Sequence, residues 1–210
     1  MVDNYAGMLY TDPEFSQCLK GADETMETKT KSSVYPLAMT AVMAAVIAAV
    51  SPFAIPIGPI SITLCTLALY FSPYILGWKR ASAATLVYIL LGMVGMPVFS
   101  KFQAGLGVLM GPTGGYILGY VPMVALAGLV IRLAPRNRGL QFLGMIGATA
   151  VLYAFGTVWY MLLSGNDLAF AMKWCVLPFI PLDLVKMAVA MILGPILRDR
   201  LVKAGIHPEG

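Results

Sequence analysis

Six long apolar runs follow one another from Val34 onward, and they restrict this chain to the class of membrane proteins. Each run approaches the roughly 20 residues that cross the hydrocarbon core of a bilayer, allowing for tilt and snorkelling ends. None shows the ten-residue alternation of barrel strands, so helices are expected. The predicted spans are Val34 to Val50, Ile62 to Trp78, Ala81 to Met96, Gly115 to Leu133, Leu140 to Leu163 and Trp174 to Leu197. The predicted fold is therefore all-α, a polytopic membrane protein with six transmembrane helices.

The composition agrees with a chain surrounded by membrane lipid. Apolar residues make up 59% and charged residues 11% of the 210 residues, whereas soluble domains are about a quarter charged. The net charge of +4 does not indicate nucleic-acid binding, because the basic residues form short clusters between apolar runs. The three cysteines are far apart and the single histidine, His207, stands alone, so no disulfide framework or metal site is predicted.

Basic residues between the predicted spans set the orientation. Eleven of the fourteen Lys and Arg residues fall on one side: Lys20, Lys29, Lys31, Lys79, Arg80, Arg132, Arg136, Arg138, Arg198, Arg200 and Lys203. The other side holds Lys101 and Lys173. Positive residues accumulate in cytoplasmic loops, so both termini are predicted to be cytoplasmic. The domains are then a polar cytoplasmic tail (1–33), a six-helix transmembrane domain (34–201) and a second cytoplasmic tail (202–210).

The last apolar run contains two opposite charges, Asp183 and Lys186. Three residues apart on a helix, they share one face. A charge in a membrane helix costs from roughly 2.5 to more than 10 kcal/mol, so such residues normally face a partner or a wet cavity. They are the first candidates for a ligand site, and the alternative is an ion pair that only fixes the helix. Pro178 and Pro181, just before them, should bend or loosen this helix.

The outward connections differ from the short basic inward ones. They are Pro52 to Ser61, Pro97 to Gly114 and Gly165 to Lys173, and the first two are apolar and rich in glycine and proline. We interpret them as a folded lid over an outward pocket, with re-entrant packing without a ligand as the alternative. Thr113 is expected to cap the fourth helix.

Other side chains are candidates for a pocket wall. They are the polar Thr63, Thr66, Tyr88, Gln103 and Asn166 and the aromatic Phe99, Trp159 and Trp174. Ala41, Ala45 and Ala49 recur every four residues on the first helix, where small side chains permit close approach of another helix, from a partner or from the same bundle. Catalysis is not indicated, because Asp183 is the sole acid deep in an apolar run and no nucleophile or metal motif occurs.

Four segments together resemble the BioY family, the biotin-binding S components of energy-coupling factor (ECF) transporters. They are Ile57 to Leu64, Tyr88 to Phe99, Gly105 to Tyr116 and Pro181 to Lys186. The resemblance covers roughly Pro36 to Leu201. It implies a protein of the bacterial inner membrane that captures biotin from outside and works with a transmembrane coupling subunit and two cytoplasmic ATPases. Cys65, Leu182 and the Lys101-Phe102-Gln103 insertion depart from the usual family pattern and bear on the selectivity among biotin-like ligands.

The resemblance also assigns roles to residues. Asp183 and Lys186 match the family's charged pair and are expected to contact the polar head of the ligand; the ligand-binding set is completed by Gln103, Tyr88, Thr63, Thr113 and Phe99. Ala41, Ala45 and Ala49 look like the docking surface for the coupling subunit. No cofactor is expected apart from biotin as the transported ligand. The alternatives are a membrane enzyme acting on a lipid or quinone, or an assembly subunit in which Asp183 and Lys186 serve structure.

Overall fold

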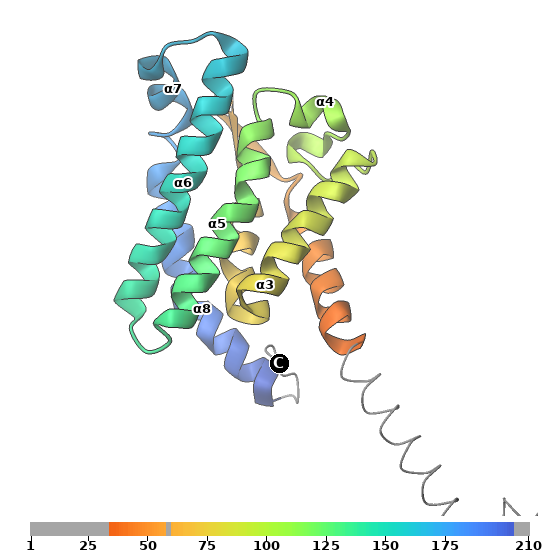
Figure 1. Cartoon of the computed structure of the whole chain (residues 1–210), viewed down its shortest axis with the longest axis vertical. Helices are drawn as coiled ribbons and strands as arrows, with labels where there is room; N and C mark the ends of the chain where they lie inside the picture. Colours follow the sequence, from red (N-terminus) through yellow and green to blue (C-terminus); the bar gives the residue numbers. More distant parts are fainter. Residues whose placement is uncertain (1–33, 58–59, 204–210) are drawn as a thin grey trace, which may run out of the picture. The chain divides into compact units, whose positions relative to one another are not determined.

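The structure is a computed structural model that describes residues 34–57 and 60–203. The predicted tail 1–33 and residues 204–210 of the predicted C-terminal tail lie outside the described residues. The chain divides after Ala38 into two units, and the second, Met39–Gly210, carries the features below. Its helices are α3 (Cys65–Met93), α4 (Leu106–Leu109), α5 (Gly114–Leu133), α6 (Arg138–Ser164), α7 (Leu168–Cys175) and α8 (Ile180–Lys203), with a short 3-10 turn η1 (Ser100–Phe102) (Figure 1). A further helix, Val34–Val50, precedes them.

Three of the described helices are long and apolar enough to cross a membrane, namely α5, α6 and α8. The first helix is apolar but shorter. The predicted fourth and fifth spans match α5 and α6 closely. The membrane class and the predominance of helix are therefore confirmed, while the count of six spans stays a prediction.

The predicted second and third spans form one helical element, α3, which is broken at Gly77. Gly77 has φ 71° and ψ 170°, a conformation open essentially to glycine alone. It separates residues 65–76 from residues 78–93, and Figure 1 shows the chain turning at this point. The break lies two residues before Lys79 and Arg80. These are the basic residues that were predicted to connect the second and third spans on the cytoplasmic side.

A β-hairpin forms within the outward connection predicted after the first helix. Strands β1 (Ala54–Ile57) and β2 (Ile60–Thr63) pair antiparallel, with Ala54 opposite Thr63 and Ile57 opposite Ile60. The all-α prediction was wrong here. The second span was also predicted to begin at Ile62, but Ile62 belongs to β2 and α3 begins at Cys65. The β-branched residues of β2 favour a strand.

The last apolar run is likewise divided. Helix α7 ends at Cys175 and α8 begins at Ile180, with a turn between them. Proline lacks a backbone N–H and is tolerated in the first turn of a helix but not in its interior. Pro178 lies in the turn and Pro181 in the first turn of α8. The prolines therefore interrupt the run, where only a bend was predicted, and place Asp183 in the first turn of the new helix. The predicted single span from Trp174 to Leu197 was wrong at its start.

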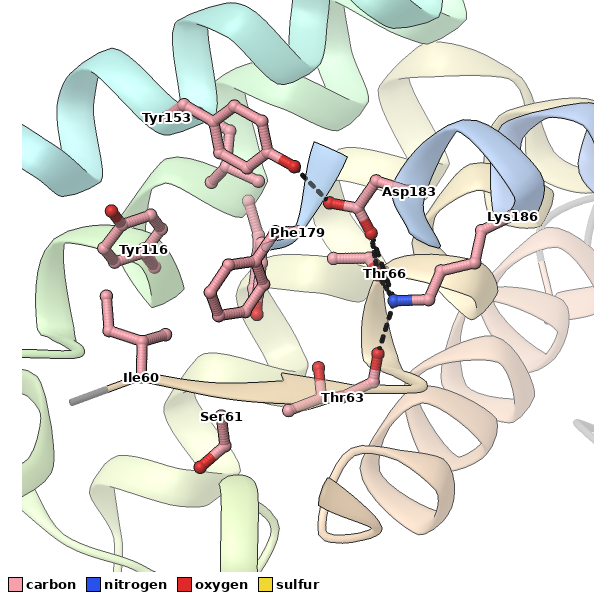
Figure 2. A pocket seen from close by; sticks show the side chains of 11 residues that line it. Ile60, Ser61, Thr63, Thr66, Tyr116, Tyr153, Phe179, Asp183 and Lys186 are labelled. Atoms are coloured by element: carbon pink, nitrogen blue, oxygen red, sulfur yellow. Dashed lines mark hydrogen bonds and ion pairs between the residues drawn. The ribbon is translucent and has the colours of Figure 1, made fainter. Parts of the chain in front are cut away.

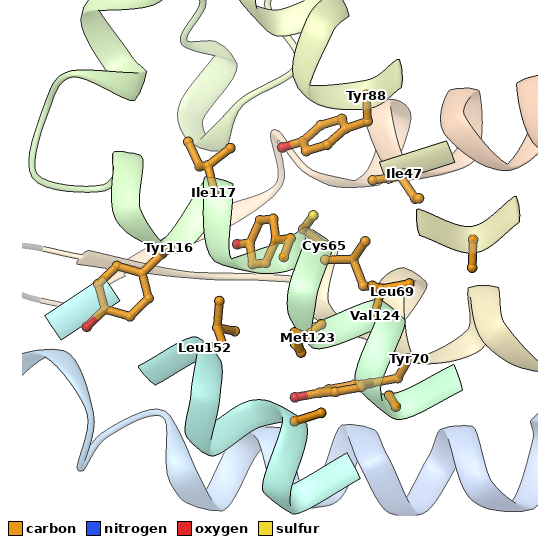
Figure 3. Packing of buried hydrophobic residues seen from close by; sticks show 14 of the residues in the cluster. Ile47, Cys65, Leu69, Tyr70, Tyr88, Tyr116, Ile117, Met123, Val124 and Leu152 are labelled. Carbon is orange, nitrogen blue, oxygen red and sulfur yellow. The ribbon is translucent and has the colours of Figure 1, made fainter. Parts of the chain in front are cut away.

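The core lies where α3 and α6 pack on α5, and Figure 3 shows its buried side chains. Gly119 and Gly156 allow this approach, because an added Cβ would collide with Leu152 and Tyr116, respectively. Small residues at helix contacts are the usual means of close packing in membranes. The Tyr70 hydroxyl and Thr149 Oγ1 are hydrogen-bonded at 2.8 Å and tie α3 to α6 inside the core.

Candidate functional site

The site begins with Asp183 and Lys186, one turn apart at the start of α8. The Asp183 side chain is buried, with only 3% of the residue exposed. The distance between Lys186 Nζ and Asp183 Oδ1 is 3.1 Å. The two charges therefore form an ion pair within one helix, and both side chains point toward the cavity drawn in Figure 2.

Asp183 accepts hydrogen bonds from three different side chains. Tyr153 Oη on α6 donates to Oδ2 at 2.7 Å, Thr66 Oγ1 on α3 donates to Oδ1 at 3.3 Å, and Lys186 donates to Oδ1. An ionised carboxylate has about four lone-pair sites. One acceptor site of Asp183 therefore remains beyond these three contacts.

Lys186 uses its ammonium group differently. Besides Asp183, it donates to the main-chain oxygen of Thr63 at 2.8 Å and to Thr66 Oγ1 at 2.9 Å. An ammonium has three donors, so these contacts match its full capacity. Lys186 thus links the end of β2 to α3 and α8, and Asp183 is the member of the pair with capacity left for a ligand.

Two adjoining chambers lie beside this network, and each has a volume of about 40 Å³. The Asp183 chamber is lined by Ile60, Ser61, Thr63, Thr66, Tyr116, Tyr120, Leu152, Tyr153, Phe179, Asp183 and Lys186. The Ser100 chamber is lined by Ser51, Ile60, Ser61, Thr63, Tyr88, Ser100, Gln103, Val108, Thr113, Tyr116, Ile117 and Tyr120. Five residues line both, so the chambers share a wall formed by β2 and α5.

Six of the seven predicted ligand residues line these chambers. Asp183 and Lys186 line the first, Thr63 lines both, and Tyr88, Gln103 and Thr113 line the second. Residues separated by more than 100 positions in the sequence are thus brought to one site.

Phe99 is the exception among them. It is fully buried, lies against Gly92 and meets the Tyr88 ring edge-on with the centroids 5.8 Å apart. It lines neither chamber and instead supports Tyr88, whose hydroxyl is hydrogen-bonded to Ser51 Oγ at 2.6 Å.

Thr113 does not play the structural role expected for it. It occupies the N-cap position of α5, but its side chain makes no capping hydrogen bond. Its φ and ψ of −87° and −10° are helical, whereas a capping side chain normally accompanies an extended backbone. The capping prediction is therefore wrong, and the hydroxyl is left at the wall of the Ser100 chamber.

The remaining predicted wall residues are used elsewhere. Trp159 Nε1 donates to the Gly111 carbonyl at 3.1 Å, and Asn166 donates to the Tyr160 hydroxyl at 3.1 Å. Trp174 is partly exposed and packs beside Phe170. These side chains fix loops and helix ends outside the two chambers.

Sequence reasoning missed several polar residues of the site, above all Tyr153. A phenol in the middle of an apolar run, far from the interfaces where tyrosine normally gathers, is a signal that could have indicated it. Tyr120 carries the same signal on α5, and Tyr116 and Tyr120 line both chambers. Among the described residues, no three His, Cys, Asp or Glu side chains are grouped to hold a metal ion.

The alanine row of the first helix faces outward from the second unit. Ala41, Ala45 and Ala49 are exposed, whereas Met43 and Ile47, on the opposite face, are buried. The internal contacts of this helix therefore use the other face and leave the alanine row open.

Comparison with known sequences identifies similar proteins along most of the chain. The model of the BioY family matches residues 24–203. The chain is 33% identical to "Biotin transporter BioY2" of Lactococcus lactis subsp. cremoris over 163 residues, which are 78% of this chain and 90% of that protein. It is 34% identical to "Biotin transporter BioY" of Thermotoga maritima over 140 residues, which are 67% of this chain and 82% of that protein.

A solved structure has the same fold. It is the crystal structure of an S-component for biotin from an ECF-type ABC transporter, which superposes with a TM-score of 0.75 at 23% sequence identity. The match covers 80% of this chain and 93% of the other. At this identity the likeness concerns the fold.

Proposed function

Because the chain belongs to the BioY family, we propose that it is the biotin-binding component of an uptake system in the bacterial inner membrane. It binds biotin from the outer side and is energised by a separate coupling and ATPase module. The observation that carries this proposal is the Asp183–Lys186 ion pair at the wall of a largely apolar chamber. Relatives at 33 and 34% identity are named biotin transporters, so a transport role is favoured over an enzymatic one.

The ureido head of biotin can donate a hydrogen bond to the acceptor site that remains on Asp183. This group offers two N–H donors and one strong oxygen acceptor. Asp183 has an acceptor site beyond its three contacts, and a bond from a ureido N–H to a carboxylate is a charge-assisted hydrogen bond, stronger than a neutral one. Lys186 already directs its three donors to Thr63, Thr66 and Asp183, so the ureido group meets the pair through an N–H at Asp183 rather than through its oxygen at Lys186.

The walls of the Asp183 chamber fit the fused rings of the ligand. Ile60, Leu152 and Phe179 supply apolar surface, and Tyr116 and Tyr120 supply aromatic faces with polar ends. Ligand sites are mostly apolar with a few placed polar groups. Each chamber alone has space for only about three water molecules by the volume that one water needs. A ligand the size of biotin therefore extends through both chambers and moves some lining side chains.

The partners follow from the exposed alanine row on the first helix. Ala41, Ala45 and Ala49 present small side chains on a face that is not packed within the second unit. Such a face suits close helix packing against a membrane partner. We assign it to the transmembrane coupling subunit, which in turn contacts two cytoplasmic ATPases.

The proposed topology has six membrane spans with both termini in the cytoplasm. Gly77 divides α3 into two arms that serve as the second and third spans, and the basic Lys79 and Arg80 follow this break. The Ala134–Asn137 connection between α5 and α6 contains Arg136 and would lie on the same side. The hairpin, η1 and α4 would then lie on the outer side, over the chambers.

Uptake of radiolabelled biotin tests this function. The chain is expressed, with and without a coupling subunit and its ATPases, in cells that lack their own biotin uptake. We expect accumulation with the wild-type chain and loss of accumulation with Asp183→Asn at equal amounts of membrane-inserted protein. Asp199→Asn, an exposed carboxylate on the same helix, is the matched control and should transport normally. Equal uptake by Asp183→Asn and the wild type would remove Asp183 from the proposed mechanism.

A further inference from the structure

One polar atom at the chamber walls has no partner in the structure. Ser100 Oγ is buried and makes no hydrogen bond among the described residues. Ser100 lines the second chamber together with Ser51, Tyr88, Gln103 and Thr113. Ser51 and Tyr88 satisfy each other at 2.6 Å. A buried hydroxyl without a protein partner is costly and rare in native proteins, so the Ser100 hydroxyl is available to a group that enters the chamber.

The backbone that carries Ser100 is held in an unfavourable conformation. Lys101 and Phe102, the next two residues, both have φ of 60°, and positive φ is uncommon for residues other than glycine. The turn is closed by the Phe99 N–H, which donates to the Gln103 carbonyl at 3.0 Å. It is also anchored to the end of the first helix, because the Lys101 N–H donates to the Pro52 carbonyl at 3.0 Å.

Backbone strain of this kind persists where the surroundings enforce it, and it is concentrated in ligand clamps and active sites. The Phe102 ring also packs edge-on against Phe53, with the centroids 6.0 Å apart. The turn is thus fixed on both sides of Lys101. The backbone position of Ser100 at the chamber wall is therefore fixed before any ligand arrives.

The groups that line this chamber favour a ligand group that accepts hydrogen bonds. Among the described residues no Asp or Glu lines it, whereas Ser100, Gln103 and Thr113 can donate. The other chamber holds the only carboxylate among the residues of both walls, and that carboxylate is suited to donors on the ligand. The two ends of the site are therefore complementary to opposite ends of one molecule.

We propose that Ser100 is a specificity-determining residue that donates its hydroxyl proton to the carboxylate at the tail of the ligand. This inference rests on the proposed function, because it places the ureido head at Asp183 and the acid tail at Ser100. The shared wall of the two chambers, which includes Ser61, Thr63 and Tyr120, lies along the ligand between its ends. Ser100 thereby distinguishes acids from neutral analogues with the same ring system.

Calorimetric titration of the purified full-length chain with two ligands tests this proposal. The ligands are biotin and biotinol, in which a primary alcohol replaces the carboxylate. A hydrogen bond to a charged group is stronger than one to a neutral group. We therefore expect Ser100→Ala to weaken biotin binding about tenfold or more and biotinol binding about threefold or less. Ser100→Thr, which keeps a hydroxyl, should restore most of the affinity for biotin.

Ser82→Ala is the matched control. The Ser82 hydroxyl donates to the Trp78 carbonyl of its own helix, and Ser82 lines neither chamber. This variant should bind both ligands like the wild type. The proposal is overturned if Ser100→Ala retains wild-type affinity for biotin, or loses the same factor for both ligands, as expected for a hydroxyl satisfied by water alone. A folded wild-type chain that binds no biotin at all would instead remove the proposed function and this inference with it.

Discussion

At the residue scale, the site depends on a buried carboxylate, Asp183, and on the partly buried ammonium of Lys186 that neutralises it. Removing one partner of a buried ion pair leaves an uncompensated charge and typically costs about 3–5 kcal/mol, whereas replacing both is far less harmful. Lys186→Met leaves Asp183 with two hydroxyl donors and no cation. We expect this variant to lower the thermal unfolding temperature of the purified protein, and Asp183→Asn combined with Lys186→Met to regain part of the loss.

Lys173→Met is the control for this pair of variants, because Lys173 is exposed on α7. It should leave the unfolding temperature unchanged. A Lys186→Met protein as stable as the wild type would show that the ion pair contributes nothing to the fold.

Tyr153 provides a second test at this scale. Its hydroxyl donates to Asp183 Oδ2 at 2.7 Å and so fixes the carboxylate from the α6 side. A hydrogen bond to a charged group contributes about 1.5–3 kcal/mol. We expect Tyr153→Phe to fold normally and to weaken biotin binding by roughly tenfold or more in an equilibrium binding assay. Unchanged affinity would mean that the carboxylate is oriented without this bond.

The charged pair could be predicted from sequence, but its network could not. Two charges in an apolar run are conspicuous because lipid penalises them. Thr66 and the Thr63 carbonyl are 117 and 123 positions away from their partners, and spacing along the chain carries no information about such contacts. Tyr153 was missed because a single phenol does not by itself identify its partner.

At the element scale, the break at Gly77 determines how the two arms of α3 run. Its φ of 71° with ψ of 170° is strained for any residue with a Cβ. We expect Gly77→Ala to destabilise the protein by about 1–3 kcal/mol, measured as a lower unfolding temperature in detergent.

Gly147→Ala is the matched control, since an added Cβ there meets nothing within 4 Å and the position is inside α6. Alanine favours a helix over glycine by about 1 kcal/mol, so this variant should be as stable as the wild type or more so. Equal stability of the two variants would show that the break at Gly77 does not require glycine.

The exposed alanine row supplies another test of an element. A larger side chain at Ala45 should prevent a partner helix from approaching while leaving both chambers untouched. We expect Ala45→Leu to bind biotin normally and to lose most ATP-dependent uptake. Ala154→Leu, at an exposed position of α6, is the control and should keep both normal biotin binding and normal uptake. Normal uptake by Ala45→Leu would exclude this face as the docking surface.

The helices and strands that could be predicted are those that a single strong sequence pattern defines. The lengths of α5 and α6 follow from uninterrupted apolar runs. The hairpin was missed, because Ile60 to Thr63 alternates over only four residues and runs directly into the apolar start of α3. The division between α7 and α8 was foreseen only as a bend, since sequence alone does not distinguish a proline kink from a complete interruption.

At the scale of the whole molecule, the helices bring one carboxylate, one ammonium and a set of hydroxyls to the walls of two adjoining chambers. Tyr153 comes from α6, Thr66 from α3 and Asp183 from α8. The hairpin and the Ser100 turn complete the second chamber. This arrangement suits a molecule with donors at one end and an acid at the other, which is the chemistry of biotin.

The central claim is that Asp183 binds the polar head of biotin. Calorimetric titration of the purified wild-type chain and its Asp183→Asn variant with biotin tests it most directly. We expect one binding site with a dissociation constant between nanomolar and low micromolar, which corresponds to a favourable binding free energy of about 8–12 kcal/mol. Asp183→Asn should weaken binding by about a hundredfold or more, because the ureido N–H groups lose a charged acceptor. Absence of binding by the well-folded wild type, or equal affinity of the two proteins, would contradict the account.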